Sequence, residues 1–218
     1  MKKDVKSTGR YHSTLRTAQA ELTKARILEA ARDLFAVRGF AGTTVTAVAE
    51  AAGVAPETVY ASFRHKRALL EGVVDNAIQP GAASHDDAVA EIAALGSPRD
   101  RLRDYVRFCC SVLARTSPAH HIVRGAADRE AFATELRARL LAERLASQTR
   151  HLALLVGGAL ASGLTVEAAA ERFCALTSAE VYHLLTSELG WSQDACNAWL
   201  TELAVASLLS REGIAGGA

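Results

Sequence analysis

The spacing of the apolar residues narrows the fold class at once. They recur every three or four positions, and no segment alternates apolar and polar residues with period two over a sustained stretch. Ile27, Ala31, Leu34 and Phe35, for example, stand at the i, i+4, i+7 and i+8 spacing of one helix face. Aromatic residues make up only 6% of the chain and alanine is abundant, which favours helix over sheet. The sequence therefore predicts an all-α protein.

Composition excludes several other classes. The chain has 218 residues, of which 50% are hydrophobic and 22% charged, so an intrinsically disordered protein is excluded. No apolar run approaches the roughly 18–20 residues that a membrane span requires, and the first residues lack the apolar core of a signal peptide. We therefore expect a cytoplasmic protein that does not interact with membranes. The four cysteines show no Cys-x-x-Cys spacing and are predicted to be free, buried thiols, with no metal site and no cofactor.

The net charge of +1 hides an uneven distribution along the chain. Residues 1–70 hold 12 Lys and Arg against 6 Asp and Glu, whereas the rest holds 13 against 18. All five lysines lie within the first 66 residues. A basic N-terminal part on an acidic body indicates a module that binds a polyanion. Such a basic face can also be merely solvated, so charge alone does not decide.

Helix start and stop signals divide the N-terminal part into short helices. A helix from Leu22 is expected to end near Gly39, Thr44 offers a hydroxyl N-cap for a short second helix, and Gly53 ends that helix. A brief third helix follows from Pro56. Later helices are expected at 86–94, 98–116, 119–127, 128–156, 165–189 and 192–210, separated by glycines and by Ser117-Pro118.

Two short helices joined by a glycine turn, at residues 43–63, have the layout of a helix-turn-helix. The third helix carries small side chains that would let it enter a major groove about 12 Å wide. These are Ala55, Pro56, Thr58, Ala61 and Ser62, while Tyr60 and Lys66 beside them offer donors for phosphates. An ordinary helical hairpin would show the same bare pattern.

The segment 26–70 resembles the N-terminal domain of the tetracycline-repressor-type (TetR) family of bacterial transcription regulators. The matching features include Gly39-Phe40, Thr43-Thr44-Val45, Ala52-Gly53-Val54, Thr58-Val59-Tyr60 and Lys66 followed by Leu69-Leu70. The resemblance implies a helix-turn-helix that binds double-stranded DNA. It implies phosphate contacts from Thr44, Tyr60 and Lys66, and a base-facing surface of Pro56, Glu57, Thr58, Ala61 and Ser62.

This sequence departs from the family pattern at the base-reading positions. Val45 stands where the tetracycline repressor has an arginine that reads a base, and Ala61 and Ser62 replace larger side chains. Glu57 can accept only from a cytosine amino group. Specificity is therefore expected to depend also on thymine methyl contacts, DNA shape and the N-terminal arm.

The resemblance also implies the domain organisation. Residues 1–20 are expected to form a flexible basic arm, 21–65 the DNA-binding domain, 66–80 a connecting fourth helix, and 81–218 a helical domain for effector binding and dimerisation. The last two helices would pair with those of a second copy in a homodimer. Their apolar positions include Val181, Leu184 and Trp199, but periodicity does not decide which of them face a partner.

The family's effector pocket opens among the middle helices, and an unidentified, small, largely apolar effector is expected there. The residues that could line it are Val74, Tyr105, Cys109, His121, Arg124, His151 and Tyr182. Release from DNA by the effector would make the protein a repressor. Two alternatives stay open, a nucleoid-type DNA-binding protein without effector and a redox-sensing regulator that uses Cys109-Cys110. No G-x-S-x-G, G-x-G-x-x-G, P-loop or H-E-x-x-H motif is present, so we do not expect an enzyme.

Overall fold

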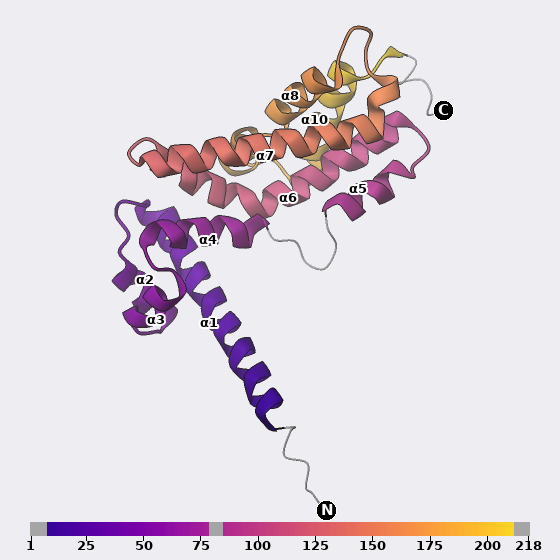
Figure 1. Ribbon diagram of the computed structural model, residues 1–218. Coiled ribbons are helices and arrows are strands. Elements are labelled where there is room, and N and C mark those ends of the chain that lie inside the picture. Colours follow the sequence, from indigo (N-terminus) through magenta and orange to yellow (C-terminus); the bar gives the residue numbers. More distant parts are fainter. Residues whose placement is uncertain (1–7, 79–84, 212–218) are drawn as a thin grey trace, which may run out of the picture. The chain divides into compact units, whose positions relative to one another are not determined.

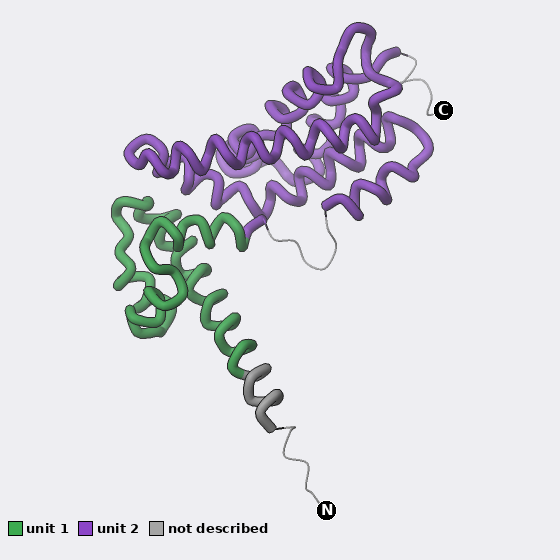
Figure 2. The backbone as a smooth tube through the Cα atoms, viewed as in Figure 1, with its two compact units in different colours: residues 1–76 green, residues 77–218 purple. Residues whose placement is uncertain are grey.

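The computed structural model describes residues 8–78 and 85–211. The chain divides into two compact units, Met1–Asn76 and Ala77–Ala218 (Figure 2). Within the described residues the regular elements are helices. In addition, one isolated antiparallel bridge pairs Leu160 with Leu209. The all-α fold class predicted from the sequence is thereby confirmed.

The first unit consists of α1 (Thr8–Arg38), α2 (Val45–Ala52), α3 (Pro56–Ser62) and most of α4 (Lys66–Ile78). Its core is formed by the residues that the helical spacing predicted. The side chains of Ile27, Phe35, Val48, Val59 and Leu69 are all at most 1% exposed. Burying each of these apolar side chains contributes roughly 1.5–3 kcal/mol, so a small but complete core holds the short helices together.

Helix α1 begins earlier than the sequence indicated. Residues 8–20, expected to belong to a flexible arm, form its first turns, and residues 1–7 lie outside the described part of the chain. The stretch has no apolar face, and residues 16–22 are exposed. Its second half, residues 15–20, nevertheless consists mainly of Leu, Arg, Ala and Gln, which extend an existing helix at little cost. The absence of an amphipathic period indicated exposure, and it was wrongly interpreted as lack of helix.

The second unit is built on two long helices, α6 (Pro98–Ala127) and α7 (Ala131–Val156), which run alongside each other (Figure 1). Packed against them are α5 (His85–Ala93), α8 (Val166–Leu176), α9 (Ala179–His183) and α10 (Gln193–Leu208). A 3₁₀ turn at Gly157–Ala159 follows α7, and a π-helical turn at Leu184–Glu188 follows α9. Large buried side chains such as Leu102, Leu152, Phe173 and Leu200 fill the space between the helices.

Helix α6 continues through Pro118, where the sequence predicted a break between helices at 98–116 and 119–127. A proline inside a helix removes one backbone hydrogen bond and costs about 3 kcal/mol. The buried face of α6 continues across it, with Leu113 and Ser117 before the proline and Ala119 and Ile122 after it. Packing along this uninterrupted face offsets the local cost, and the break predicted from the proline alone was wrong.

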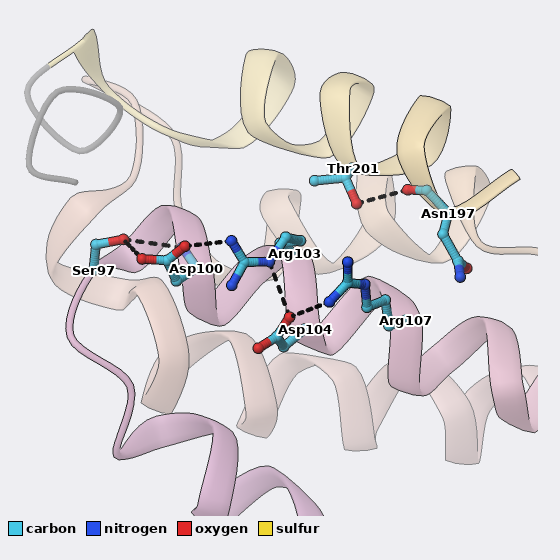
Figure 3. A network of polar contacts seen from close by, with 7 residues as sticks. All are labelled: Ser97, Asp100, Arg103, Asp104, Arg107, Asn197 and Thr201. Atoms are coloured by element: carbon cyan, nitrogen blue, oxygen red, sulfur yellow. Dashed lines mark hydrogen bonds and ion pairs between the residues drawn. The ribbon is translucent and has the colours of Figure 1, made fainter. Parts of the chain in front are cut away.

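The start of α6 carries a ladder of polar side chains (Figure 3). Ser97 caps the helix by accepting from the Asp100 backbone N–H at 3.1 Å, and its hydroxyl donates to the Asp100 carboxylate at 2.6 Å. Arg103 pairs with Asp100 and with Asp104, which in turn pairs with Arg107. These pairs are largely exposed, so their main effect is to support the first turns of the helix rather than to add much stability.

The helix expected at 165–189 is two helices in the structure. Thr177 is the C-cap of α8, with its hydroxyl donating to the Phe173 carbonyl at 2.7 Å, and Ser178 then caps α9 by accepting from the Val181 N–H at 3.2 Å. Hydroxyl side chains compete with the backbone in this way and favour helix ends. The break matters for the site below, because the Thr177 hydroxyl also binds side chains of α7.

Candidate functional site

The turn between α2 and α3 is fixed by a cap at each end of α2. Thr44 precedes the helix, and its side-chain oxygen accepts from the Ala47 N–H at 3.1 Å. Gly53 ends the helix with φ +64°, a left-handed conformation that L side chains rarely adopt, and α3 then begins at Pro56. Thr44 is exposed, so its hydroxyl is accessible to a phosphate near the N-terminus of α2.

Helix α3 presents small side chains to solvent. Glu57, Ala61 and Ser62 are exposed, Pro56 and Thr58 are partly exposed, and Val59 on the opposite face is buried. Tyr60 is 50% exposed. An α-helix with such a face can enter the major groove of B-DNA, and the two larger side chains at its edge, Glu57 and Tyr60, reach the farthest.

Lys66, at the start of α4, is not simply a surface cation. Its Nζ donates to the carbonyl oxygens of Phe40 and Thr43 at 2.8 and 3.0 Å, and lies 4.3 Å from the centre of the Phe40 ring. Lys66 thereby ties α4 to the loop between α1 and α2. One N–H of the ammonium group is left for the phosphate contact that the resemblance implies.

The second unit contains a cavity of about 260 Å³ between α6 and α7, near the start of α5. Its apolar wall includes Phe108, Val112, Leu113 and Leu140. Its polar wall comes from residues on one face each of α5, α6 and α7: His85, Tyr105, His120, Arg144, Gln148 and His151. A concave, mainly apolar space with a few polar groups is the usual form of a small-molecule site.

Three of these elements are joined by a hydrogen-bond chain that is buried at Tyr105 and His151 and exposed at Asp86. His151 Nε2 lies 3.0 Å from the Asp86 carboxylate, and His151 Nδ1 lies 2.9 Å from the Tyr105 hydroxyl. Because the pKa of Asp86 is lowered by this hydrogen bond, the carboxylate is ionised and only accepts, so Nε2 carries a proton. In neutral His151, Nδ1 then accepts from Tyr105. The chain links α5, α6 and α7 at one end of the cavity.

Burial sets the charge state of the other groups in the cavity wall. It lowers the pKa of His85 and of His120 below 6.5, and the neighbouring Arg115 and Arg144 guanidinium groups respectively lower them further. Burial also raises the pKa of the Cys109 thiol to about 12. Both histidines and the thiol are therefore neutral near pH 7, and Arg144 is the cation of the wall.

Comparison with known proteins identifies the first unit. Residues 27–73 match the family described as "Bacterial regulatory proteins, tetR family". The chain carries the N-terminal domain of the TetR family. A 58-residue segment is 40% identical to the HTH-type transcriptional regulator TtgR of Pseudomonas putida, and a 56-residue segment is 34% identical to UidR of Escherichia coli. These segments cover 26–27% of this chain and 28–29% of the relatives, which are transcriptional regulators rather than enzymes.

Solved structures of TetR-family proteins extend the likeness of fold to the second unit. NalD of Pseudomonas aeruginosa, described as the secondary repressor of the MexAB-OprM multidrug efflux pump, has a TM-score of 0.65 at 21% identity, over 89% of this chain and 99% of NalD. A complex of SmeT with triclosan has a TM-score of 0.69 at 19% identity, over 88% and 94% of the two chains. At these identities the comparison establishes the fold, an N-terminal helix-turn-helix domain followed by a helical domain.

The structure brings together only some of the residues predicted for a TetR-type effector pocket. Tyr105, Cys109 and His151 line the cavity. Two others lie in a hollow of about 70 Å³ on the far part of α6: His121, stacked on His183, and Arg124, 4.0 Å from Glu180. Tyr182 is a core residue whose hydroxyl donates to Gln193 at 2.6 Å, and Val74 is buried within the first unit.

Two cavity residues that the sequence analysis missed, Arg144 and Gln148, lie on α7. With His151, which was predicted, they follow the i, i+4, i+7 spacing of one helix face, and this face lines the cavity. Polar residues also occupy the other faces of α7, so the spacing alone did not single out this one. His85 was not singled out either, because it lies in a segment that the sequence marks only as a connector.

The predicted dimerisation helices carry exposed apolar side chains. Leu184 is 44% exposed, Leu189 59%, Trp191 36% and Trp199 37%, and the two tryptophan rings pack edge to face with centres 5.7 Å apart. Phe173, Leu185, Leu200 and Leu208, which the sequence could not separate from them, are instead buried in the core. The structure thus sorts the apolar residues into a core set and an exposed set, here called the Trp patch (Leu184, Leu189, Trp191 and Trp199).

In the part of the chain that the structure describes, no group of three or more His, Cys, Asp or Glu side chains could hold a metal ion. Across residues 8–78 and 85–211, the helices are too short or too polar to span a bilayer. The cysteines of this part are free thiols; Cys110, Cys174 and Cys196 are buried, as predicted, whereas Cys109 is only partly buried.

Proposed function

We propose that the protein is a homodimeric transcriptional repressor that binds a palindromic operator through α2 and α3 and is released by a small, largely apolar effector held between α6 and α7. The observation that carries this proposal is the TetR-family helix-turn-helix with its small-residue recognition surface on α3. The cavity in the second unit offers a place for an effector. The complex of SmeT, a protein with the same fold, with triclosan also supports this part of the proposal.

The mechanism follows from linkage. An effector shifts an equilibrium only by its different affinity for two states, so it must bind more tightly to a dimer whose α3 helices do not fit successive major grooves. Moving the population from mostly DNA-bound to mostly free takes about 5.5 kcal/mol. We propose that α4 transmits this change, because it follows the DNA-binding helices in the chain and precedes the segments that line the cavity.

The proposal is tested by selecting binding sites for the full-length protein from a random DNA pool. We expect enrichment of a sequence with twofold symmetry, with half-sites spaced by about one helical turn or slightly more. Thr58→Ala should weaken binding to the selected site more than binding to random DNA, because its side chain faces the bases in the proposed complex. Salt-dependent binding without any enriched sequence would instead indicate the nucleoid-type alternative.

The redox alternative receives no support from the thiols. Burial raises the pKa of Cys109 to about 12 and raises that of Cys110 as well, so neither forms the thiolate that reacts with oxidants near pH 7. A regulator that senses oxidants would need a more acidic and more accessible cysteine.

A further inference from the structure

Gln148 is a buried amide whose orientation is fixed by its neighbours. It lines the cavity, is 4% exposed, and its Nε2 donates to Thr177 Oγ1 at 3.2 Å. The Thr177 hydroxyl has one proton, which it donates to the Phe173 carbonyl at 2.7 Å, so toward Gln148 it can only accept. The nitrogen of the amide must therefore face Thr177, and the oxygen must face away from it.

That oxygen is left without a partner. Within the described residues, Gln148 Oε1 and His85 Nε2 are the buried side-chain atoms that make no hydrogen bond, and both residues line the same cavity. Buried polar atoms in native proteins are nearly always paired, with protein, water or ligand. Two unpaired atoms in one cavity wall indicate that the cavity is completed by something that brings its own polar groups.

We propose, building on the function proposed above, that the effector is a neutral, mainly apolar molecule bearing a hydroxyl or amide N–H group, and that this group donates a hydrogen bond to Gln148 Oε1. His85 Nε2 takes a second polar group of the same molecule, as donor or acceptor according to its tautomer. The remaining surface of the molecule packs on Phe108, Val112 and Leu113.

The charges around the cavity agree with a neutral molecule. The lowered pKa values of His85 and His120 leave both uncharged near pH 7. The wall carries one charge of each sign, the Arg144 guanidinium and the Glu143 carboxylate, and Arg144 Nη2 is already engaged by the carbonyl and hydroxyl of Thr177. A carboxylate has no proton to donate to Gln148 Oε1 and would set its own oxygens against that acceptor. The volume of about 260 Å³ limits the molecule to one or two rings.

Three probes of nearly the same shape test this assignment by calorimetry on the full-length protein without DNA. They are 2-naphthol, which has a donor, 2-methoxynaphthalene, which has none, and 2-naphthoate, which is anionic. We expect 2-naphthol to bind about 3- to 10-fold more tightly than 2-methoxynaphthalene, since a hydrogen bond to a neutral acceptor is worth about this factor. Binding of 2-naphthoate should be the weakest.

A pair of variants tests whether the preference for 2-naphthol depends on Gln148. Gln148→Met, which keeps the volume and removes the amide, should abolish the preference for 2-naphthol. Gln193→Met, the same change at a residue outside the cavity, should preserve it. The preference between probes is measured on the unmodified protein too, so the test stands even if Gln148→Met fails to fold.

The contrary outcomes are equally defined. Equal binding of 2-naphthol and 2-methoxynaphthalene, survival of the preference in Gln148→Met, tightest binding of 2-naphthoate, or no binding of any probe would each overturn the assignment. In those cases water alone, or an anion at Arg144, would complete the cavity. The proposed repressor function is judged separately, by the selection of a symmetric DNA site, which uses no effector.

Discussion

Lys66 illustrates how one residue can serve the fold and the DNA contact together. Its ammonium group binds the Phe40 and Thr43 carbonyls, so removing the charge takes one hydrogen bond from each of these part-buried acceptors. We expect Lys66→Met to lower the free energy of unfolding of the first unit by about 1–3 kcal/mol. Urea denaturation followed by circular dichroism measures this, and DNA affinity should fall as well.

The nearby Arg64 provides the matched control for Lys66. It is exposed and precedes α4 by two residues, so Arg64→Met should leave stability within about 0.5 kcal/mol. If Arg64 contacts a phosphate, the slope of log affinity against log salt should flatten by about 0.9. A Lys66→Met protein as stable as wild type would show that the two carbonyl contacts contribute nothing to the fold.

His120 makes stability depend on pH. Its pKa is lowered in the folded protein by burial and by Arg144, so below pH 6.5 the unfolded chain binds protons that the folded chain does not. Stability should therefore fall as pH falls from 6.5 toward the lower folded-state pKa. His120→Gln should lose less stability than wild type between about pH 7.5 and about pH 5.5, measured by urea midpoints at fixed protein concentration.

His85, whose pKa is lowered as well, adds to the effect, so His120→Gln should reduce the dependence without removing it. An unchanged pH dependence in His120→Gln would mean that this side chain does not remain neutral in the fold.

At the scale of single helices, two glycines with opposite surroundings make a paired prediction. A Cβ at Gly72 of α4 would lie 2.8 Å from Phe63 Cε1 and 3.0 Å from Leu28 Cδ2, both in buried side chains. Overpacking costs about 1–3 kcal/mol, while alanine gains about 1 kcal/mol of helix propensity. Gly72→Ala should therefore destabilise the first unit by about 1 kcal/mol. A Cβ at Gly125 of α6 meets nothing within 4 Å, so Gly125→Ala should stabilise by about 0.5–1 kcal/mol.

Thermal and urea unfolding of both variants measures whether their changes in stability have opposite signs. If both substitutions stabilise, helix propensity alone governs these positions and the close approach of α4 to Phe63 is unimportant. Equal destabilisation would instead point to a helix bend at Gly125 that alanine resists.

Helices were predictable where their signals are local. Thr44 and Gly53 bound α2 through side-chain and backbone bonds within a few residues, and the sequence predicted both ends. The break at Pro118 was predicted wrongly because its outcome depends on packing along the buried face of α6. The break between α8 and α9 was missed although Ser178, the N-cap of α9, is a local signal.

The proposed DNA-binding surface could be predicted from the sequence because, like α2, it depends on local signals. The cavity could not be predicted in this way. A cavity depends on which faces of α6 and α7 meet, and the sequence does not state this pairing. Tyr105 and His151 were named as polar residues of the middle helices, and only the structure shows them bonded to each other. Gln148 carries no motif, and its importance appears only with the fixed orientation of its amide.

For the whole molecule, the decisive question is whether the Trp patch joins two copies. Exposed apolar clusters of this kind mark interaction surfaces, and in a twofold dimer every substitution acts twice. The double variant Leu184→Lys, Trp199→Lys should therefore sediment as a monomer at micromolar concentration, with its helical content unchanged because both side chains are already exposed. Its affinity for a palindromic site should fall toward that for a single half-site, since two linked half-site contacts reinforce each other.

The control variant Leu154→Lys, at a 58% exposed position on α7 outside the patch, should remain dimeric. A double variant that still sediments as a dimer and binds the palindrome normally would place the dimer interface elsewhere on the second unit.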